Sequence, residues 1–378
     1  MTRIVPYVNL PLQWEEEKAF LLPVVEAVLA GGKYILDDTV ERLERRVSAL
    51  CGVQHCVGLN SGTDALILGL SGLGIKKGDE VITPPNSFIA SAAAVAHLGA
   101  TPVFADVMPN QLINPEKVRS SISPKTRAIM PVHLSGNICD MEELLSISRE
   151  TGIPVIEDAA QAIGSTFDGK QSGSFGEVGC FSAHPLKTLG AAGDAGFLVT
   201  DNEEVALRAR EWRNHGQEDR TTVTSWGGVS RLDSVQAAIL LARLERLEAS
   251  VDRRRENALV YKSELNDLPI LLPQEKTKVR SAYHTFVIQA PQRDELQQFL
   301  ASKGIGTSVH YPKPIHLQPA ASYLGYKLGD FPVCEAQADR ILSLPIHQYL
   351  SRADLDYVVA SIRHFYEAKM KTEAGHAA

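Results

Sequence analysis

Two side chains in the middle of the sequence, an aspartate and a lysine, are of the types that could act on a bound aldehyde cofactor. Asp158 ends the apolar run PVIED, and Lys187 follows in a turn of small residues between SAHP and GDAG. An amine can form an imine with an aldehyde cofactor, and a carboxylate can keep a pyridine nitrogen protonated so that the ring accepts electrons. Taken singly, Lys187 would be a surface lysine and Asp158 a helix N-cap. Together they favour pyridoxal 5′-phosphate (PLP) as the cofactor.

A second segment, GLNSGTDALILGL, suits the phosphate of such a cofactor. It reads as a strand that turns into a helix through Ser61, Gly62 and Thr63. Backbone N–H groups and a hydroxyl at a helix N-terminus form an anion site, although ordinary N-capping explains the same residues. Ser182, which ends VGCFS just before the lysine turn, could donate a further hydrogen bond. Phe88 in PPNSFIAS is the aromatic side chain expected against the ring, where the alternative is plain core packing.

Short apolar runs that alternate with helical patterns must position these residues. This alternation, between about residues 50 and 200, predicts a mostly parallel sheet covered by helices on both faces. Ligands of such sheets lie beyond the carboxyl ends of the strands, so the polar residues that end the runs are the first candidates for chemistry. The seven runs are HCVGL, EVITP, PVFAD, AIMPVH, PVIED, VGCFS and GFLVT.

The pattern changes after Arg231. A long helical stretch with apolar residues at i, i+3, i+4 and i+7 spacing follows, and we expect it to link two domains. Beyond it, the runs AYHTFVIQA and GTSVHYP predict strands, while RDELQQFLASKG and SRADLDYVVASIRHFY predict helices. We therefore expect a large domain over residues 1–250 and a smaller α/β domain over residues 251–378.

The composition narrows the classes of function. The 378 residues, with 44% hydrophobic and 22% charged, are typical of a soluble globular protein. A net charge of −7 argues against a nucleic-acid partner, because phosphate backbones are bound by basic surfaces. The five scattered cysteines form no CxxC pair and indicate reduced thiols and no metal site. No secretory signal or membrane span is visible, so we expect a cytoplasmic protein with small-molecule ligands and no membrane partner.

Six segments together resemble a known family, the DegT/DnrJ/StrS sugar aminotransferases of fold-type I. The segments are PVIEDAAQ, FSAHPLKTLGAAGDAGFLVT, SGTDAL, GDEVITPPNSFIAS, SRLDSVQAAIL and VHYPKPIHLQP. Each is weak alone, but the combination is specific. The resemblance covers nearly the whole chain. It implies a fold-type I PLP-transferase, with a mostly parallel seven-stranded sheet sandwiched by helices and a smaller C-terminal α/β domain.

The resemblance also implies roles for particular residues. Lys187 would be the catalytic Schiff-base lysine, and Asp158 would pair with the ring nitrogen. Gln161 would contact the ring hydroxyl and Phe88 would stack on the ring. The phosphate would be held by Gly62, Thr63 and Ser182. Members of the family are homodimers with active sites at the subunit interface, so we expect the stretch around SRLD to reach the other subunit.

The sequence departs from the family pattern at one position. Where the family commonly has Asn-Ser-Arg, with the asparagine on the partner's phosphate, this chain has Val229, Ser230 and Arg231. Ser230 or the backbone at Gly227 and Gly228 could replace the asparagine. Arg231 is a candidate for binding an acceptor anion or a donor carboxylate, with an interfacial ion pair as its alternative. Further substrate-binding candidates are His184, His310, Tyr311 and His316.

The reaction implied by the resemblance is a transamination from L-glutamate to a keto-sugar. A nucleotide-linked keto-sugar is the first expectation, in amino-sugar biosynthesis for a surface polysaccharide or an antibiotic. A keto-sugar free of nucleotide, such as a keto-octulosonate or an inosose, is the alternative acceptor. A PLP-dependent sugar dehydratase or cyclase is the alternative reaction, although dehydratases typically have histidine in place of Lys187. A non-catalytic regulatory protein would need none of these residues.

Overall fold

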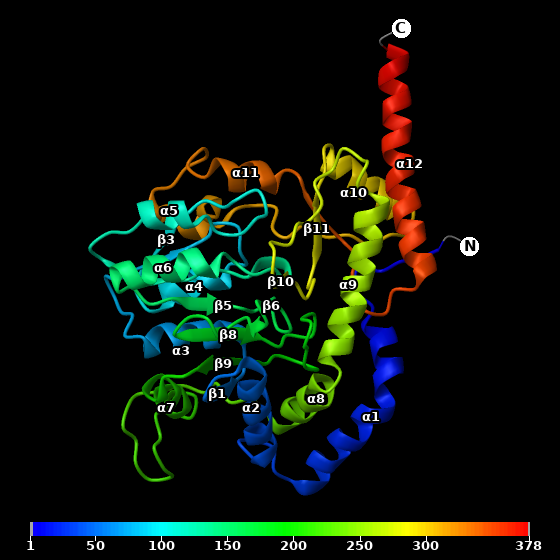
Figure 1. The fold of residues 1–378 in the computed structure, drawn as a ribbon. Coiled ribbons are helices and arrows are strands. Elements are labelled where there is room, and N and C mark those ends of the chain that lie inside the picture. Colours follow the sequence, from blue (N-terminus) through cyan, green and yellow to red (C-terminus); the bar gives the residue numbers. More distant parts are fainter. Residues whose placement is uncertain (1–2, 377–378) are drawn as a thin grey trace.

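The computed structural model describes residues 3–376, and seven strands form a mostly parallel sheet at their centre (Figure 1). The strand order is β1, β9, β8, β5, β4, β2 and β3, with β4 and β5 joined by parallel bridges. β9 is antiparallel to both of its neighbours, and the other strand pairs of this sheet are parallel. The seven predicted runs are therefore confirmed as β1 (His55–Leu59), β2 (Glu80–Thr83), β3 (Thr101–Phe104), β4 (Thr126–Ile129), β5 (Ile156–Asp158), β8 (Val178–Ser182) and β9 (Gly196–Thr200).

Helices cover both faces of this sheet, as the two-sided apolar strands require. Alternate residues of one strand face opposite layers: Phe181 packs with one group of helices, whereas its neighbour Cys180 packs with the other. The first layer holds α2 (Asp38–Cys51), α5 (Pro115–Ser120), α6 (Met141–Thr151) and α8 (Ser234–Leu244). The second layer holds α3 (Gly62–Gly72), α4 (Ala90–His97) and α7 (Glu203–Trp212).

Local sequence signals set the ends of these helices. Asp37 accepts hydrogen bonds from the amides of Thr39 and Val40 at the start of α2. Asn202 does the same at the start of α7, and Gly52 ends α2 in a left-handed conformation. Side-chain oxygens at the N-cap and glycine after the C-terminus satisfy backbone groups that the helix leaves unpaired. The ends of α2 and α7 are thus set by short-range chemistry.

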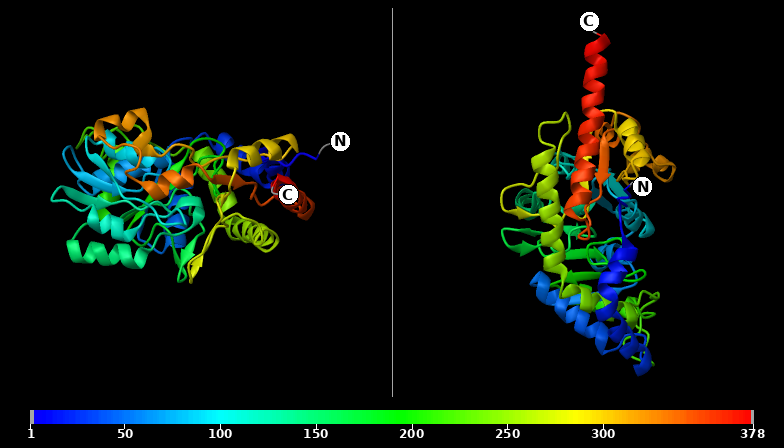
Figure 2. Two further views of the ribbon diagram at one scale, coloured as in Figure 1. Left: turned by 90° about the horizontal axis from the view of Figure 1, so that it is seen from above. Right: turned by 90° about the vertical axis from the view of Figure 1, so that its right-hand side faces the viewer.

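The helical stretch after Arg231 forms two helices, because the chain breaks at Glu245 and Arg246 between α8 and α9 (Leu247–Glu264). α9 then joins a second core with β11 (Phe286–Gln289), β12 (Ile341–Leu344), α10 (Arg293–Ser302) and α12 (Arg352–His376). Strands β11 and β12 are antiparallel. The prediction of a strand in GTSVHYP is wrong, since only Ser308 in it forms an isolated bridge, with Ser343. α12 projects beyond the rest of the molecule (Figures 1 and 2).

Two segments cross the expected boundary between residues 1–250 and 251–378, and that division stays a prediction. Val5 pairs with Ile305 and is buried in the second core, so the start of the chain lies beside the C-terminal helices (Figure 2). In the opposite direction, η2 (Ile315–Leu317), η3 (Pro319–Leu324) and α11 (Pro332–Ala338) pack near β3 of the large sheet. Asp106, at the end of that strand, accepts from the first amides of α11.

The remaining elements are peripheral to the main sheet. They are α1 (Leu10–Gly31), η1 (Leu134–Gly136), β6 (Thr166–Phe167), β7 (Lys170–Gln171) and β10 (Val279–Arg280). Over residues 3–376, no helix has both the length and the apolarity needed to cross a bilayer. The same residues contain no group of three or more His, Cys, Asp or Glu side chains placed to hold a metal ion.

Candidate active site

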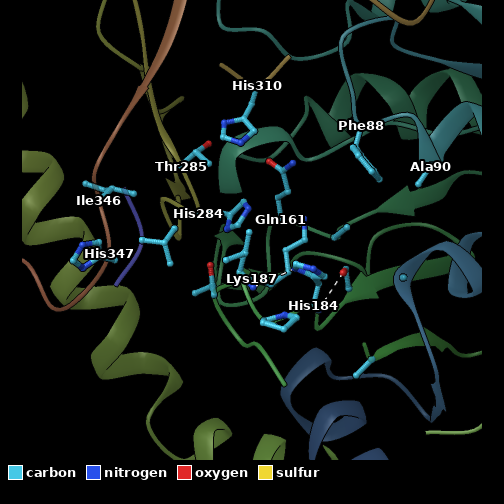
Figure 3. Close-up of a pocket in the computed structure, with 18 of the residues that line it drawn as sticks. Phe88, Ala90, Gln161, His184, Lys187, His284, Thr285, His310, Ile346 and His347 are labelled. Atoms are coloured by element: carbon cyan, nitrogen blue, oxygen red, sulfur yellow. Dashed lines mark hydrogen bonds between the residues drawn. The ribbon is translucent and has the colours of Figure 1, made fainter. Parts of the chain in front are cut away.

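A cavity of about 490 Å³ lies at the carboxyl ends of β5 and β8, beside the N-terminus of α3. Its other walls come from the first residues of the chain and from the second core, around His310 and His347. Figure 3 shows Lys187 in the middle of this space, with Gln161 and His284 above it and His184 below. The strand-end rule therefore leads to the observed cavity, and most of the sequence candidates line it: Gly62, Thr63, Phe88, Asp158, Gln161, Ser182, His184, Lys187, His310 and Tyr311.

Asp158 is the buried carboxylate of the cavity and is only 5% exposed. Its Oδ2 accepts from the Ser91 hydroxyl at 2.7 Å, and its Oδ1 accepts from the Ala160 amide at 3.2 Å. No helix follows, because residues 159–165 form turns, so the alternative role as a helix N-cap does not apply. Burial raises the pKa of Asp158, and a cation placed against it would offset that cost. This environment suits a protonated pyridine nitrogen.

Lys187 lies in the turn between β8 and β9, where its amide donates to the carbonyl of His184. No described residue accepts a hydrogen bond from its Nζ atom. Burial lowers the pKa of Lys187 to about 8, and the attraction of Asp158 acts in the opposite direction. A lysine with this pKa is largely a neutral amine in mildly alkaline solution. It can therefore attack an aldehyde or take up a proton.

Loading of PLP onto the cofactor-free protein should depend on pH through this lysine. Only the neutral amine attacks the aldehyde, so below pH 8 the rate should rise about tenfold per pH unit and then level off. Stopped-flow absorption between pH 6.5 and 10.5 would measure the profile. A midpoint near 10.5, the usual value for an exposed lysine, would contradict the burial of Lys187.

The N-terminus of α3, where SGTDAL predicts an anion site, presents hydrogen-bond donors without acceptors among the described residues. The hydroxyl oxygen of Ser61 accepts from the Asp64 amide at 3.1 Å, which leaves the amides of Gly62 and Thr63 without an acceptor in the described chain. Ser182 lies against this turn, and its Oγ accepts from the His184 amide, so its own hydrogen is available for another acceptor. Two amides, a hydroxyl and the helix dipole therefore fit a phosphate.

The close approach of α3 to β8 predicts a large effect for Gly62→Ala. A methyl group at position 62 would lie 2.6 Å from Cβ and 2.9 Å from Cα of Ser182, so the helix would have to move. We expect a loss of about 1–3 kcal/mol in the free energy of unfolding and weaker PLP binding. Urea unfolding and PLP titration would measure both. Gly31→Ala, where nothing lies within 4 Å, is the matched control and should leave both unchanged.

Gln161, Tyr311 and Phe88 form one wall of the cavity. Gln161 Oε1 accepts from the Ser135 amide at 2.7 Å, and its Nε2 donates to the Tyr311 hydroxyl at 3.3 Å. The rings of Phe88 and Tyr311 lie 5.8 Å apart, and Phe88 is 54% exposed. A fixed amide and an accessible aromatic face suit a planar ring with a hydroxyl group. The residues present therefore fit PLP, with the phosphate at α3 and the ring nitrogen at Asp158.

The remaining substrate candidates fall into two groups. His184 and His310 line the cavity, and Nδ1 of His310 lies 2.9 Å from the Ser343 hydroxyl. Arg231 and His316 do not line it. Arg231 donates to Asn214 at 3.2 Å, and His316 is buried against Phe331 with its Nε2 3.0 Å from Glu335. The interaction with Glu335 and the ring packing give His316 a structural role in this chain.

The segment that replaces the family's asparagine is partly engaged within the subunit. Val229 is half exposed and bridges to Asn214. The Ser230 hydroxyl donates to Asn60 Oδ1 at 3.1 Å and accepts from the Asn60 amide at 3.3 Å. Ser230 is therefore held by its own chain, which disfavours it as the substitute for the asparagine.

Several cavity residues lack a local sequence signal. Ser91 does not line the cavity, but its hydroxyl donates to Asp158 from the first turn of α4. Tyr7, Arg254, His284 and Gln348 come from distant parts of the chain. Only tertiary structure places them together.

The chain is similar to known aminotransferases in sequence and in fold. The model of the DegT/DnrJ/EryC1/StrS aminotransferase family matches residues 15–363. A "Pleiotropic regulatory protein" of Geobacillus stearothermophilus is 40% identical over 367 residues, 96% of this chain and 98% of its own length. A dTDP-3-amino-3,4,6-trideoxy-alpha-D-glucose transaminase of Streptomyces venezuelae is also 40% identical, with 96% of each chain covered. The crystal structure of S. venezuelae DesV in complex with a ketimine intermediate superposes with a TM-score of 0.95, covering 97% of this chain and 99% of that one.

Proposed function

The chain belongs to the DegT/DnrJ/EryC1/StrS aminotransferase family, and we propose that this PLP-dependent enzyme moves an amino group from L-glutamate to a nucleotide-linked keto-sugar. The observation that carries the proposal is that Asp158 and Lys187 line one cavity, beside a helix N-terminus. The similarity to a transaminase of a dTDP-linked sugar supports a nucleotide-linked acceptor. The product would be an amino sugar for a surface polysaccharide or an antibiotic.

We propose that the described residues divide the work as follows. When bound, PLP supplies an aldehyde that takes up the amine and a protonated ring that withdraws electrons from the reacting carbon. Lys187, as a neutral amine, would take the proton from the α-carbon of the donor and give it to the cofactor carbon that carries the aldehyde. Asp158 keeps the ring nitrogen protonated. Gln161 and Phe88 would hold the plane of the ring, so that the C–H bond that breaks could stand perpendicular to it.

We propose further that the enzyme is a homodimer with shared active sites. The cavity is flanked by apolar side chains that solvent reaches in the single chain, namely Phe88 and Leu186. Trp226, close to the Val229 segment, is 96% exposed. Exposed apolar side chains that lie beside one cavity, as Phe88 and Leu186 do, are typical of a surface that another chain covers. Sedimentation velocity of the PLP-loaded protein would measure the state, and a monomer with full activity would contradict the proposal.

The experiment that tests the proposed function begins with the near-visible absorption of the PLP-loaded protein. Adding L-glutamate should convert the band of the lysine-bound cofactor to that of the aminated form and release 2-oxoglutarate. A panel of nucleotide-linked and nucleotide-free keto-sugars should then restore the original band with only its true acceptor. If the protein binds PLP but no amino donor changes its spectrum, a dehydratase or cyclase is indicated. If it binds no PLP, a regulatory protein is indicated.

A further inference from the structure

The cavity contains a buried guanidinium without a counterion. Arg254 lies on α9, is 7% exposed and lines the cavity. The other two buried arginines of the described chain both have acidic partners, Glu44 for Arg213 and Asp294 for Arg293. Among the side chains of residues 3–369, no carboxylate lies within ion-pair distance of Arg254. Since buried charges are normally paired, the counterion of Arg254 is expected to come from a ligand.

The hydrogen bonds of Arg254 leave one end of the guanidinium open. Its Nε donates to Gln348 Oε1 at 3.1 Å, and its Nη1 donates to the carbonyls of Tyr283 and His284 at 3.2 and 3.3 Å. These three acceptors are neutral, so they orient the group without cancelling its charge. No described residue accepts from Nη2. Arg254 is thus preorganised, with one amino group available to an anion.

The surroundings of Arg254 supply no negative charge. Burial lowers the pKa of His284 and, together with the charge of Arg254, that of His347, so both rings are neutral. Burial raises the pKa of Tyr7 to about 12, so its phenol is neutral too. The buried carboxylate of the cavity, Asp158, faces the expected ring nitrogen. An anionic ligand beside Arg254 would therefore meet an uncompensated positive charge.

His284 connects this charge to the reacting centre. Its carbonyl accepts from Arg254, and its ring lies close enough to Lys187 for the lysine charge to lower the ring's pKa further. Figure 3 shows His284 directly beside Lys187. An amino acid reacting at Lys187 carries a carboxylate within a few bonds of its amine, and Arg254 and Lys187 line the same cavity. The phosphate of the cofactor already has its own site at α3.

We propose that Arg254 binds a carboxylate of the amino donor through Nη2. This assignment rests on the proposed function and deepens it, because it identifies the residue that selects an acidic donor. Gln348 is the positioning residue, since it fixes the plane of the guanidinium. The specificity for an amino-acid donor would then come from the second core rather than from the parallel sheet.

The test is calorimetric titration of the PLP-loaded enzyme with glutarate, a dicarboxylate that has no amine and cannot react. We expect Arg254→Lys to weaken glutarate binding about ten- to hundredfold, because a charge-assisted hydrogen bond and its fixed geometry are lost. Gln348→Glu leaves the arginine in place and gives it an internal counterion, so it should weaken binding similarly. Arg253→Lys, an exposed neighbour on α9 that pairs with Glu256, is the matched control and should bind as the wild type does.

The outcomes separate this proposal from the proposed function. Glutarate binding of wild-type strength in Arg254→Lys or in Gln348→Glu would overturn the role of Arg254, even if L-glutamate still aminates the cofactor. A parallel titration with UDP tests whether Arg254 instead binds the diphosphate of a nucleotide-linked acceptor. If these variants lose UDP binding and keep glutarate binding, Arg254 serves the acceptor sugar and the proposal is wrong. Failure of L-glutamate to change the cofactor spectrum of the wild type would instead contradict the proposed function.

Discussion

Lys187→Ala is expected to lower turnover by at least about 10³-fold, because it removes the side chain proposed both to hold the cofactor and to move the proton. No other lysine lines the cavity, so among its described side chains no second primary amine can take over both roles. The variant should still fold and bind PLP through the phosphate site, but without the absorption band of the lysine-bound cofactor. Absorption spectra and steady-state rates with L-glutamate would measure both effects.

Chemical rescue gives this prediction its control. Methylamine added to Lys187→Ala should restore part of the rate in proportion to its neutral fraction, because it can enter the space left by the side chain. Lys125→Ala removes an exposed lysine remote from the cavity and should have wild-type activity. A Lys187→Ala variant with more than about a tenth of wild-type turnover would exclude general base catalysis by this residue.

Asp158→Asn should lower kcat by about 10²–10³-fold while leaving the fold intact. Asparagine keeps the shape and can still meet the Ser91 hydroxyl and the Ala160 amide, so the main change is the lost negative charge. Without that charge the ring nitrogen loses its proton and withdraws electrons less well. The amination of bound PLP by L-glutamate, followed in a stopped-flow instrument, would measure the loss.

Two further variants test whether the effect comes from the negative charge of Asp158. Asp168→Asn changes an exposed aspartate that pairs with Lys278, and it should have no effect on the rate. In Asp158→Ala, a PLP analogue methylated on the ring nitrogen carries a permanent positive charge and should recover activity that PLP itself does not. If Asp158→Asn turns over at the wild-type rate, the carboxylate does not set the protonation of the ring nitrogen.

The part of the fold that is predictable from sequence is the part set by local patterns. The seven strands are short apolar runs bounded by polar residues and turns, and each is found where its run lies. The expectation of a strand in GTSVHYP fails because no neighbouring segment pairs with it beyond Ser308. Period-2 patterning indicates a chain that can form a strand, whereas pairing depends on a partner that is distant in sequence.

The candidate site shows the same division. Asp158, Lys187 and Gly62 lie at strand ends or helix starts, so the parallel-sheet rule brings them together. No local pattern predicts the burial of Arg254, because a charged run such as DRRREN normally indicates the solvent-exposed face of a helix. Arg254 is buried only because α9 packs between the two cores, with Val251 in one and Ala258 in the other. His316 shows the converse, a polar residue of a family motif that tertiary packing removes from the cavity.

The pairing of Val5 with Ile305 has a consequence for biosynthesis. The segment that follows Val5 contributes Tyr7, Val8 and Asn9 to the cavity wall, so this wall is made first by the ribosome and completed last. The large sheet can form as soon as residue 200 has emerged, but the first residues must wait, exposed, for residues beyond 300. In this order the proposed cofactor-binding residues, all of which precede residue 200, can come together before the wall around Tyr7 is complete.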